Sequence, residues 1–284
     1  MSIKRVGVVG SGTMGVGIAE VAAAAGCEVV VRSRSAATAE GLVAVLGRSL
    51  ARQVEKDKRT ESDAAEILAR VTATGELEEL ADCDLVIESI VEDLAAKKQL
   101  FMELDGLTRR DAILATNTST LPVVELAMET SRPELVCGIH FFNPAPVMRL
   151  VEVVVPITAS ADTIATVHDF VAGCGKEAVE VKDRAGFVVN ALLFPYLNGA
   201  MRLLEAQVAT MEGIDAAMTG GCGFPMGPFA LLDLVGLDTS LSILEALHRE
   251  GGDPSSLPSP MLRRLVAAGR LGRKSGHGFY DYRR

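Results

Sequence analysis

The sequence of 284 residues contains few cysteines, and they form no recognisable pair. The five cysteines are far apart, their number is odd, and no Cys-x-x-Cys motif occurs. This pattern argues against a disulfide scaffold and is typical of a reduced, cytoplasmic protein. The four histidines have no metal-ligand spacing to another histidine or to a cysteine, so no metal site is expected.

The sequence also lacks an excess of positive charge, a signal peptide and a long apolar run. A formal net charge of −9 argues against nucleic acid as a partner. The apolar run after Lys4 and Arg5 enters a glycine turn instead of a small-residue cleavage site. The uncharged stretch 185–201 contains Asn190 and Pro195, which argue against a membrane span and favour a buried or subunit-facing helix.

A glycine motif follows the first apolar strand and precedes a helical pattern: Gly10-Ser-Gly-Thr-Met-Gly15. Strand, G-x-G-x-x-G and helix together are the setting of a dinucleotide fingerprint. Gly10 permits the tight turn, Gly12 lets the backbone approach a pyrophosphate, and Gly15 lets helix and strand close up. The alternative is a glycine-rich turn that binds nothing, and the sequence context favours the dinucleotide site.

Strand-like and helical patterns alternate as far as about residue 182, and only helical patterns follow. This predicts an α/β fold with an N-terminal Rossmann-type doubly wound sheet in residues 1–184 and a C-terminal all-helical domain in residues 185–284. Strands are expected at 3–9, 28–31, 71–74, 84–89, 112–115, 136–142, 150–155 and 178–182. Helices after the second strand are expected at 36–58, 61–70, 161–174, 187–210, 213–219, 229–249 and 261–268, with a rigid loop at 220–228. A further charged helix is expected between residue 93 and about residue 104, and another is expected to start at Pro122.

The second expected strand ends in Arg32-Ser33-Arg34-Ser35, without the acidic residue that usually binds the ribose 2′-hydroxyl of NAD. Two guanidiniums and two hydroxyls suit a 2′-phosphate, because arginine pairs with phosphate through several donors. The segment therefore predicts NADP(H) in preference to NAD(H). The alternative is a solvated turn.

Two further groups of residues are candidate ligand contacts. Arg52 and Lys56 share a face of the expected helix 36–58, where they could receive a phosphorylated ligand or form a solvated basic face. The segment Thr116-Asn-Thr-Ser-Thr-Leu-Pro122 places hydroxyls and an amide at the carboxyl end of a strand, where doubly wound sheets bind ligands. The hydroxyls of Ser119 and Thr120 could equally cap the next helix.

The central segment reads as two short strands, 136–142 and 150–155, joined by a loop with two prolines. Strands that fold back on one another could bring Glu152 beside His140, where it would orient the ring and stabilise the imidazolium. This makes a general acid/base with an orienting group. The alternative is a core histidine and an edge-strand charge.

Together these motifs resemble the 3-hydroxyacyl-CoA dehydrogenase family, particularly its single-function short-chain members, the 3-hydroxybutyryl-CoA dehydrogenases. The similar motifs extend over almost the whole chain. They lie at 10–15, 117–119, 140–144, 150–152, 186–190, 225–228, 272–276 and 278–280.

The resemblance implies that His140 is the catalytic acid/base, Glu152 its partner, and Ser119 and Asn190 hydrogen-bond donors around the C3 oxygen and the thioester. It also implies CoA-phosphate contacts from Arg52 and Lys56, and a homodimer through the C-terminal helices. The implied dinucleotide contacts are Gly10, Gly12, Met14, Gly15, Glu92, Lys97, Asn117 and Asn143.

The sequence departs from the family pattern at two positions. Ser33 stands where the family usually has Asp, which supports the prediction of NADP(H). Ala185 replaces a common Pro before Gly186, which is expected to loosen the hinge without touching the chemistry.

The activity that the resemblance implies is reversible hydride transfer between NADP(H), or NAD(H), and a (3S)-3-hydroxyacyl-CoA or 3-ketoacyl-CoA. The expected substrate pair is 3-hydroxybutyryl-CoA and acetoacetyl-CoA. The alternatives are a 3-hydroxyadipyl-CoA dehydrogenase, a dehydrogenase of a free hydroxy acid such as gulonate, and a non-catalytic dinucleotide-binding scaffold. The intact set of Ser119, His140, Glu152 and Asn190 argues against the scaffold.

Overall fold

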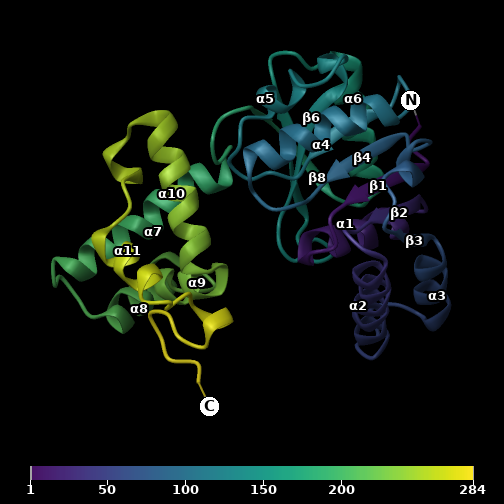
Figure 1. The fold of residues 1–284 in the computed structure, drawn as a ribbon. Helices are drawn as coiled ribbons and strands as arrows, with labels where there is room; N and C mark the ends of the chain where they lie inside the picture. The colour runs from purple at the N-terminus through teal and green to yellow at the C-terminus, as the bar shows by residue number, and fades with distance from the viewer. Residues whose placement is uncertain (1, 284) are drawn as a thin grey trace. The chain divides into compact units, whose positions relative to one another are not determined.

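The structure is a computed structural model that describes residues 2–283, apart from the side chains of residues 36, 37 and 40. The chain divides into two compact units, Met1–Asp183 and Arg184–Arg284. The first unit carries the sheet, and the second is built from helices (Figure 1). The predicted fold class is therefore confirmed.

The first unit is organised around one eight-stranded sheet. Its order is β3-β2-β1-β4-β5-β6-β7-β8, and every neighbouring pair is parallel except β6 with β7. From β1 the chain adds β2 and β3 on one side and then crosses over to add β4 on the other side. A doubly wound sheet binds its ligand at the carboxyl ends of the strands beside such a reversal of strand order. The strands are Arg5–Val9 (β1), Glu28–Arg32 (β2), Val71–Thr74 (β3), Leu85–Glu88 (β4), Ile113–Thr116 (β5), Val136–Phe141 (β6), Leu150–Val155 (β7) and Glu177–Lys182 (β8).

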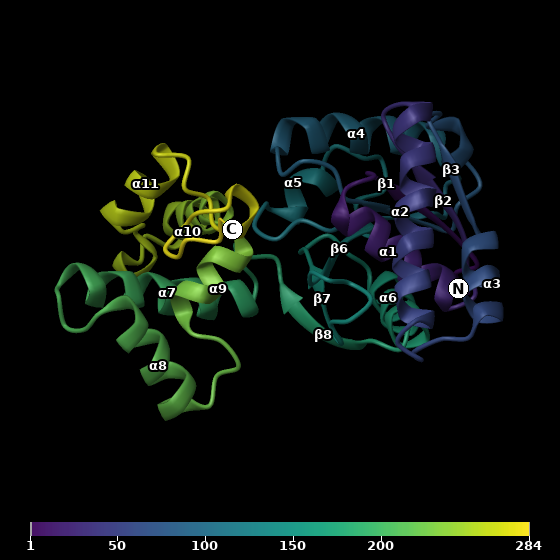
Figure 2. The same ribbon diagram turned by 90° about the horizontal axis from the view of Figure 1, so that it is seen from below.

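Helices cover both faces of this sheet (Figure 2). One core joins α1, α2, α3 and α6 to alternate strand residues such as Val6 and Val8. Gly138 faces away from that core and lies against Val123 of α5, so α5 and the neighbouring α4 cover the other face. The helices are Thr13–Ala24 (α1), Ala36–Val54 (α2), Glu61–Ala69 (α3), Leu94–Leu107 (α4), Val123–Ala127 (α5) and Ala161–Gly173 (α6), with short 3-10 turns at Glu78–Leu80 (η1) and Pro133–Leu135 (η2).

The second unit has its own hydrophobic core, which includes Phe194, Leu232 and Leu244. The uncharged stretch lies mainly in α7, where the fully buried Asn198 bonds the backbone around Ser255 and Ser259. Within residues 2–283, the structure contains no helix with the length and apolar character that crossing a membrane requires. The helices are Val189–Glu205 (α7), Met211–Cys222 (α8), Pro228–Val235 (α9), Leu237–Gly251 (α10) and Pro260–Ala267 (α11), with 3-10 turns at Pro254–Ser256 (η3) and Arg273–Ser275 (η4).

The prediction of a single helix over 229–249 is wrong, because the chain forms α9 and α10 there. Gly236 separates them with a φ of 104°, which no helix accommodates. The next amide, that of Leu237, donates to the carbonyl of Leu271. The loop predicted at 220–228 is also shorter than expected, because α8 continues to Cys222.

The predicted helix over 36–58 is too long, since α2 ends at Val54. Asp57 adopts a φ of 53°, and the amide of Lys58 turns back to the carbonyl of Gln53. Lys56 therefore lies in the turn beyond the helix. The prediction that Arg52 and Lys56 share a helix face is wrong, although both residues are exposed.

Candidate active site

The glycine loop between β1 and α1 has two positions that only glycine fits. A Cβ on Gly10, whose φ is 124°, would lie 2.3 Å from the carbonyl oxygen of Ser89, and a Cβ on Gly15 would lie 1.9 Å from that of Gly10. Gly12 is different, because a Cβ there would meet nothing within 4 Å. Gly12 is the N-cap of α1, and no side chain caps that helix. Open space above uncapped amides suits the pyrophosphate of a dinucleotide.

The predicted 2′-phosphate corner is less open than expected. Ser33 is 2% exposed, and its Oγ lies 2.8 Å from Ser11 Oγ and 2.5 Å from Thr38 Oγ1. Ser35 is the N-cap of α2 and accepts from the amide of Thr38. The hydroxyls of Ser33 and Ser35 therefore already have hydrogen-bond partners within the protein.

The two guanidiniums of this segment have different surroundings. Arg32 lines a groove that also contains the carboxylates of Glu76, Glu78 and Glu103. Arg34 is exposed. Because a phosphate is repelled by carboxylates, Arg34 is the better placed of the two to receive one.

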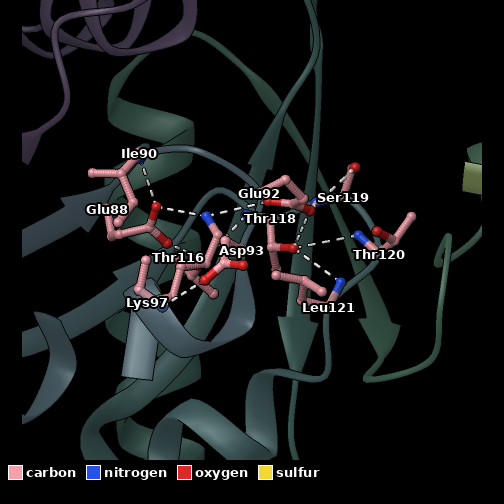
Figure 3. Close-up of polar contacts among 11 residues, drawn as sticks. Glu88, Ile90, Glu92, Asp93, Lys97, Thr116, Thr118, Ser119, Thr120 and Leu121 are labelled. Atoms are coloured by element: carbon pink, nitrogen blue, oxygen red, sulfur yellow. Dashed lines mark hydrogen bonds and ion pairs between the residues drawn. The ribbon is translucent and has the colours of Figure 1, made fainter. Parts of the chain in front are cut away.

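A buried ion pair lies beyond the glycine loop, at the carboxyl end of β4 (Figure 3). Lys97, on the first turn of α4, is 1% exposed, and its Nζ lies 2.6 Å from Glu88 Oε1 and 3.2 Å from Glu92 Oε2. Glu88 is fully buried. The predicted dinucleotide contacts Glu92 and Lys97 are therefore bonded to each other, and Lys97 has little surface left for a ligand.

Glu92 connects this ion pair to the loop after β5. Its Oε1 accepts from Thr118 Oγ1 at 2.5 Å and from the amide of Ser119 at 3.0 Å, and its side chain is 39% exposed. Burial raises the pKa of the Glu92 carboxyl, but the Lys97 ammonium and these hydrogen bonds outweigh burial. The net result is a pKa below the ordinary value, so Glu92 is a carboxylate that holds the Ser119 segment.

The alternative role of Ser119 and Thr120 as helix caps is wrong. The N-cap of α5 is Pro122, which has no side-chain cap bond. The carboxylate of Asp183 accepts from the amides of the first two residues of α5 instead. Ser119 stays available as a ligand contact.

Glu88, Thr116 and Thr118 belong to the same hydrogen-bond network. Thr116 and Thr118 lie in the predicted ligand-binding segment 116–122, but Glu88 was not identified from the sequence. Thr116 Oγ1 donates to Glu88 Oε2 at 2.6 Å and accepts from the amide of Thr118. The sequence signal was a glutamate at the end of a buried strand, followed nine residues later by Lys97. Charged side chains usually face solvent, so the burial of Glu88 and Lys97 depended on tertiary packing.

Asn117 joins the ends of β5 and β6. Its Oδ1 accepts from the amide of Phe141 at 2.8 Å, next to His140. Asn143, the other predicted asparagine contact, is exposed in the loop between β6 and β7. The loop after β5 is therefore fixed beside the strand that carries the histidine.

His140 and Glu152 are brought together as predicted. They are opposite each other in the antiparallel pair β6 and β7, and His140 Nδ1 lies 2.7 Å from Glu152 Oε2. The two residues are 6% and 1% exposed, and the ring of Phe142 lies 4.5 Å from the imidazole. A carboxylate on Nδ1 makes that nitrogen the donor, so proton transfer to a ligand would use Nε2.

Asn190 belongs to the second unit, where it is the second residue of α7 and is 8% exposed. This helix begins at Val189 instead of at 187, because Gly186 and Phe187 have φ values of 73° and 47°. Met14 lies on the first turn of α1 and packs partly against the sheet core. The roles of Asn190 and Met14 stay predictions.

Comparison with known proteins identifies related chains. The family model described as "3-hydroxyacyl-CoA dehydrogenase, NAD binding domain" matches residues 5–184, and the C-terminal domain model of the same family matches residues 186–282. A nicotinamide dinucleotide is thus the cofactor of the N-terminal domain.

Similar proteins cover nearly the full length. A probable 3-hydroxybutyryl-CoA dehydrogenase of Bacillus subtilis is 46% identical over 282 residues, 99% of this chain and 98% of that protein. A 3-hydroxybutyryl-CoA dehydrogenase of Mycobacterium tuberculosis is 47% identical over 287 residues, 99% of each chain. The crystal structure of an (S)-3-hydroxybutyryl-CoA dehydrogenase from Ralstonia eutropha is 42% identical, covers 100% of both chains and has a TM-score of 0.96. The chain belongs to the 3-hydroxyacyl-CoA dehydrogenase family.

Proposed function

We propose that this chain catalyses reversible hydride transfer between a nicotinamide dinucleotide and a (3S)-3-hydroxyacyl-CoA, with 3-hydroxybutyryl-CoA and acetoacetyl-CoA as the substrate pair. The observation that carries the proposal is the bond between His140 and Glu152 at the carboxyl end of the sheet. The names of the similar proteins from Bacillus subtilis, Mycobacterium tuberculosis and Ralstonia eutropha support this substrate, and the name of the Ralstonia eutropha protein also supports its (S) configuration.

The proton is the part of the reaction that the protein must handle. When bound, the dinucleotide supplies or accepts the hydride at C4 of its nicotinamide. In the reductive direction His140 donates a proton from Nε2 to the oxygen on C3, and in the oxidative direction the same nitrogen removes it. Glu152 holds the ring and stabilises the imidazolium. Ser119 and Asn190 donate hydrogen bonds to the C3 oxygen and the thioester.

The activity is tested by the change in absorbance at 340 nm with acetoacetyl-CoA and either NADPH or NADH. Oxidation of the dinucleotide is expected only in the presence of acetoacetyl-CoA. Parallel assays in the oxidative direction with 3-hydroxyadipyl-CoA and with gulonate test the two alternative substrates. No turnover of any of them would leave the chain as a dinucleotide-binding scaffold.

The preferred dinucleotide in this proposal is NADP(H). Position 33 carries a serine instead of a carboxylate, and Arg34 next to it is exposed. The acidic groove around Arg32 leaves Arg34 as the cation that contacts the 2′-phosphate. A larger kcat/KM with NADPH than with NADH is expected. A clear preference for NADH would reject the NADP(H) assignment and leave the hydride-transfer proposal intact.

The CoA phosphates are proposed to contact Arg52 and Lys56, two exposed cations at the end of α2. Replacing both with glutamine is expected to raise the KM for acetoacetyl-CoA and to leave the KM for the dinucleotide unchanged. Lys58 is an exposed lysine of the same turn and serves as the control. An equal effect of Lys58→Gln would reject a defined phosphate contact.

We also propose a cytoplasmic homodimer that associates through the C-terminal helices. Leu192 and Leu203 of α7 are 72% and 47% exposed, and apolar side chains of this size favour burial in an interface. Light scattering on the purified chain should give twice the monomer mass. Leu192→Asp is expected to produce monomers, and a monomeric wild-type chain would reject this part of the proposal.

A further inference from the structure

Glu88 is a fully buried carboxylate that the proposed reaction does not use. It accepts three hydrogen bonds: from Lys97 Nζ at 2.6 Å, from the amide of Ile90 at 2.7 Å and from Thr116 Oγ1 at 2.6 Å. A buried carboxylate is costly unless its oxygens are bonded, and both oxygens of Glu88 are.

Two chains of hydrogen bonds lead from Glu88 to the same segment of the loop after β5. The first passes through Lys97 to Glu92, which accepts from the Thr118 hydroxyl and from the amide of Ser119 (Figure 3). The second passes through Thr116, whose hydroxyl accepts from the amide of Thr118 at 3.1 Å. The two routes converge on Thr118 and Ser119.

The converging bonds fix the backbone of the loop as well as its side chains. Thr118 Oγ1 accepts from the amides of Leu121 at 3.0 Å and Thr120 at 3.4 Å. Thr118 is 1% exposed. The orientation of Ser119 therefore depends on the residues that hold Thr118 and Glu92.

The charges explain why Glu88 matters for Glu92. The ammonium of Lys97 lies between two carboxylates and is removed from solvent. Glu88 is the closer and the more buried of the two carboxylates: it lies 2.6 Å from the ammonium and is fully buried, whereas Glu92 lies 3.2 Å away and its side chain is 39% exposed. A displacement of the Lys97 ammonium changes its interaction energy with Glu92 more in this buried site than it would in water.

We propose that Glu88 is a positioning residue, which orients Ser119 for the reaction through Lys97 and Glu92 and through Thr116 and Thr118. This inference rests on the proposed function, because it assumes that Ser119 contacts the substrate oxygen. Glu88 touches neither substrate nor cofactor in this proposal.

The test compares Glu88→Gln with Glu20→Gln. Glu20 is the matched control, a carboxylate of α1 that is 1% exposed and accepts from Ser49 at 2.8 Å and Gln53 at 2.7 Å. Each substitution is made in the wild-type chain and in Ser119→Ala, and kcat is measured with acetoacetyl-CoA.

Glu88→Gln is expected to lower kcat on the order of 10- to 100-fold in the wild-type chain, the scale of a misplaced catalytic contact. In the Ser119→Ala background it should change kcat by less than about twofold, because the effects of residues that act through one another are not additive. Glu20→Gln should change kcat in neither background. An equal loss from Glu88→Gln in both backgrounds, or an unchanged kcat, would overturn the inference.

Hydrogen exchange of the amides of Ser119 and Leu121 separates this inference from the proposed function. Both amides donate into the network. Glu88→Gln should speed their exchange and Glu20→Gln should not, whether or not the chain turns over acetoacetyl-CoA. A chain without turnover but with this exchange pattern would refute the proposed function and retain the link from Glu88 to the loop. Unchanged exchange would refute the link itself.

Thr116→Val is the second variant, for use if Glu88→Gln does not fold. It removes the hydroxyl between Glu88 and Thr118 and retains the buried ion pair. Faster exchange of the amides of Thr118 and Ser119 supports the second route. Exchange at the wild-type rate would exclude it.

Discussion

His140 and Glu152 face each other across the one antiparallel pair of the sheet, with Nδ1 2.7 Å from Oε2. The register produces this contact, because a slip of one residue would send the two side chains to opposite faces. Both residues are buried, so the contact is shielded from solvent. The pair can therefore act as one unit in proton transfer.

Replacing Glu152 with glutamine tests the partner of the histidine. The amide oxygen can still accept from Nδ1, but it carries no charge to stabilise the imidazolium. We expect kcat to fall by about 100-fold or more, within the range of general acid/base catalysis. Glu180→Gln is the control, since the exposed Glu180 lies 3.8 Å from the half-buried His168. A kcat of Glu152→Gln equal to that of the control would show that the charge on Glu152 is dispensable.

Gly12 and Gly15 should respond differently to alanine. A Cβ on Gly15 meets a carbonyl oxygen at 1.9 Å, so Gly15→Ala is expected to destabilise the fold by roughly 1–3 kcal/mol. Gly12→Ala has space and a φ of −73°, so its Tm should stay close to the wild-type value. Its Kd for the dinucleotide should nevertheless rise about tenfold or more, which corresponds to 1.4 kcal/mol. Thermal unfolding and fluorescence titration measure the two effects, and a wild-type Kd for Gly12→Ala would place the pyrophosphate elsewhere.

Arg34→Gln tests the 2′-phosphate contact. The KM for NADPH should rise about tenfold, whereas the KM for NADH should stay the same because NADH has no 2′-phosphate. Arg48 is an exposed arginine of α2, and Arg48→Gln serves as the control for the loss of one positive charge. Equal changes with both dinucleotides would assign Arg34 a general electrostatic effect.

The Glu92 carboxyl should make stability depend on acid pH. Its pKa in the folded chain lies below the ordinary value of 4.5: burial raises it, but Lys97 and the hydrogen bonds from Thr118 and Ser119 outweigh burial. Such a group contributes stability above its unfolded pKa and loses this contribution as pH falls through its folded pKa. Between about pH 6 and about pH 3.5, the Tm of the wild-type chain should therefore fall more than that of Glu92→Gln.

Glu79→Gln provides the control for this pH dependence, because Glu79 is exposed. Its Tm should follow the wild-type curve as the pH is lowered. If the curve of Glu92→Gln also ran parallel to the wild-type curve, Glu92 would not be the group responsible.

The sheet and its histidine pair were predictable because local signals agreed. Pro144 and Pro146 mark a loop between two apolar runs, and two strands joined by a short loop pair antiparallel. That pairing set His140 opposite Glu152 without any knowledge of distant residues. The glycine fingerprint was recognisable as a local motif between a strand and a helix, although only the contact of Gly15 with Gly10 is local and that of Gly10 is with Ser89 after β4.

The remaining features depended on contacts that the sequence pattern does not contain. The apolar spacing continues across Gly236, so the break between α9 and α10 could not be seen. The turn at Asp57 ends α2 early through a positive φ, which asparagine and aspartate tolerate better than most residues do. Burial of Lys97 between Glu88 and Glu92 required α4 to place this side chain against the end of β4 and the loop that follows it.

The most direct test of proton transfer is the kcat of His140→Gln with acetoacetyl-CoA, measured together with the Kd for the dinucleotide. Loss of the general acid should lower kcat by about 10²- to 10⁴-fold and leave the Kd within about twofold of the wild-type value. His168→Gln, which replaces a half-buried histidine of α6, should retain wild-type kcat. A His140→Gln variant that turns over acetoacetyl-CoA at the wild-type rate would show that another group supplies the proton.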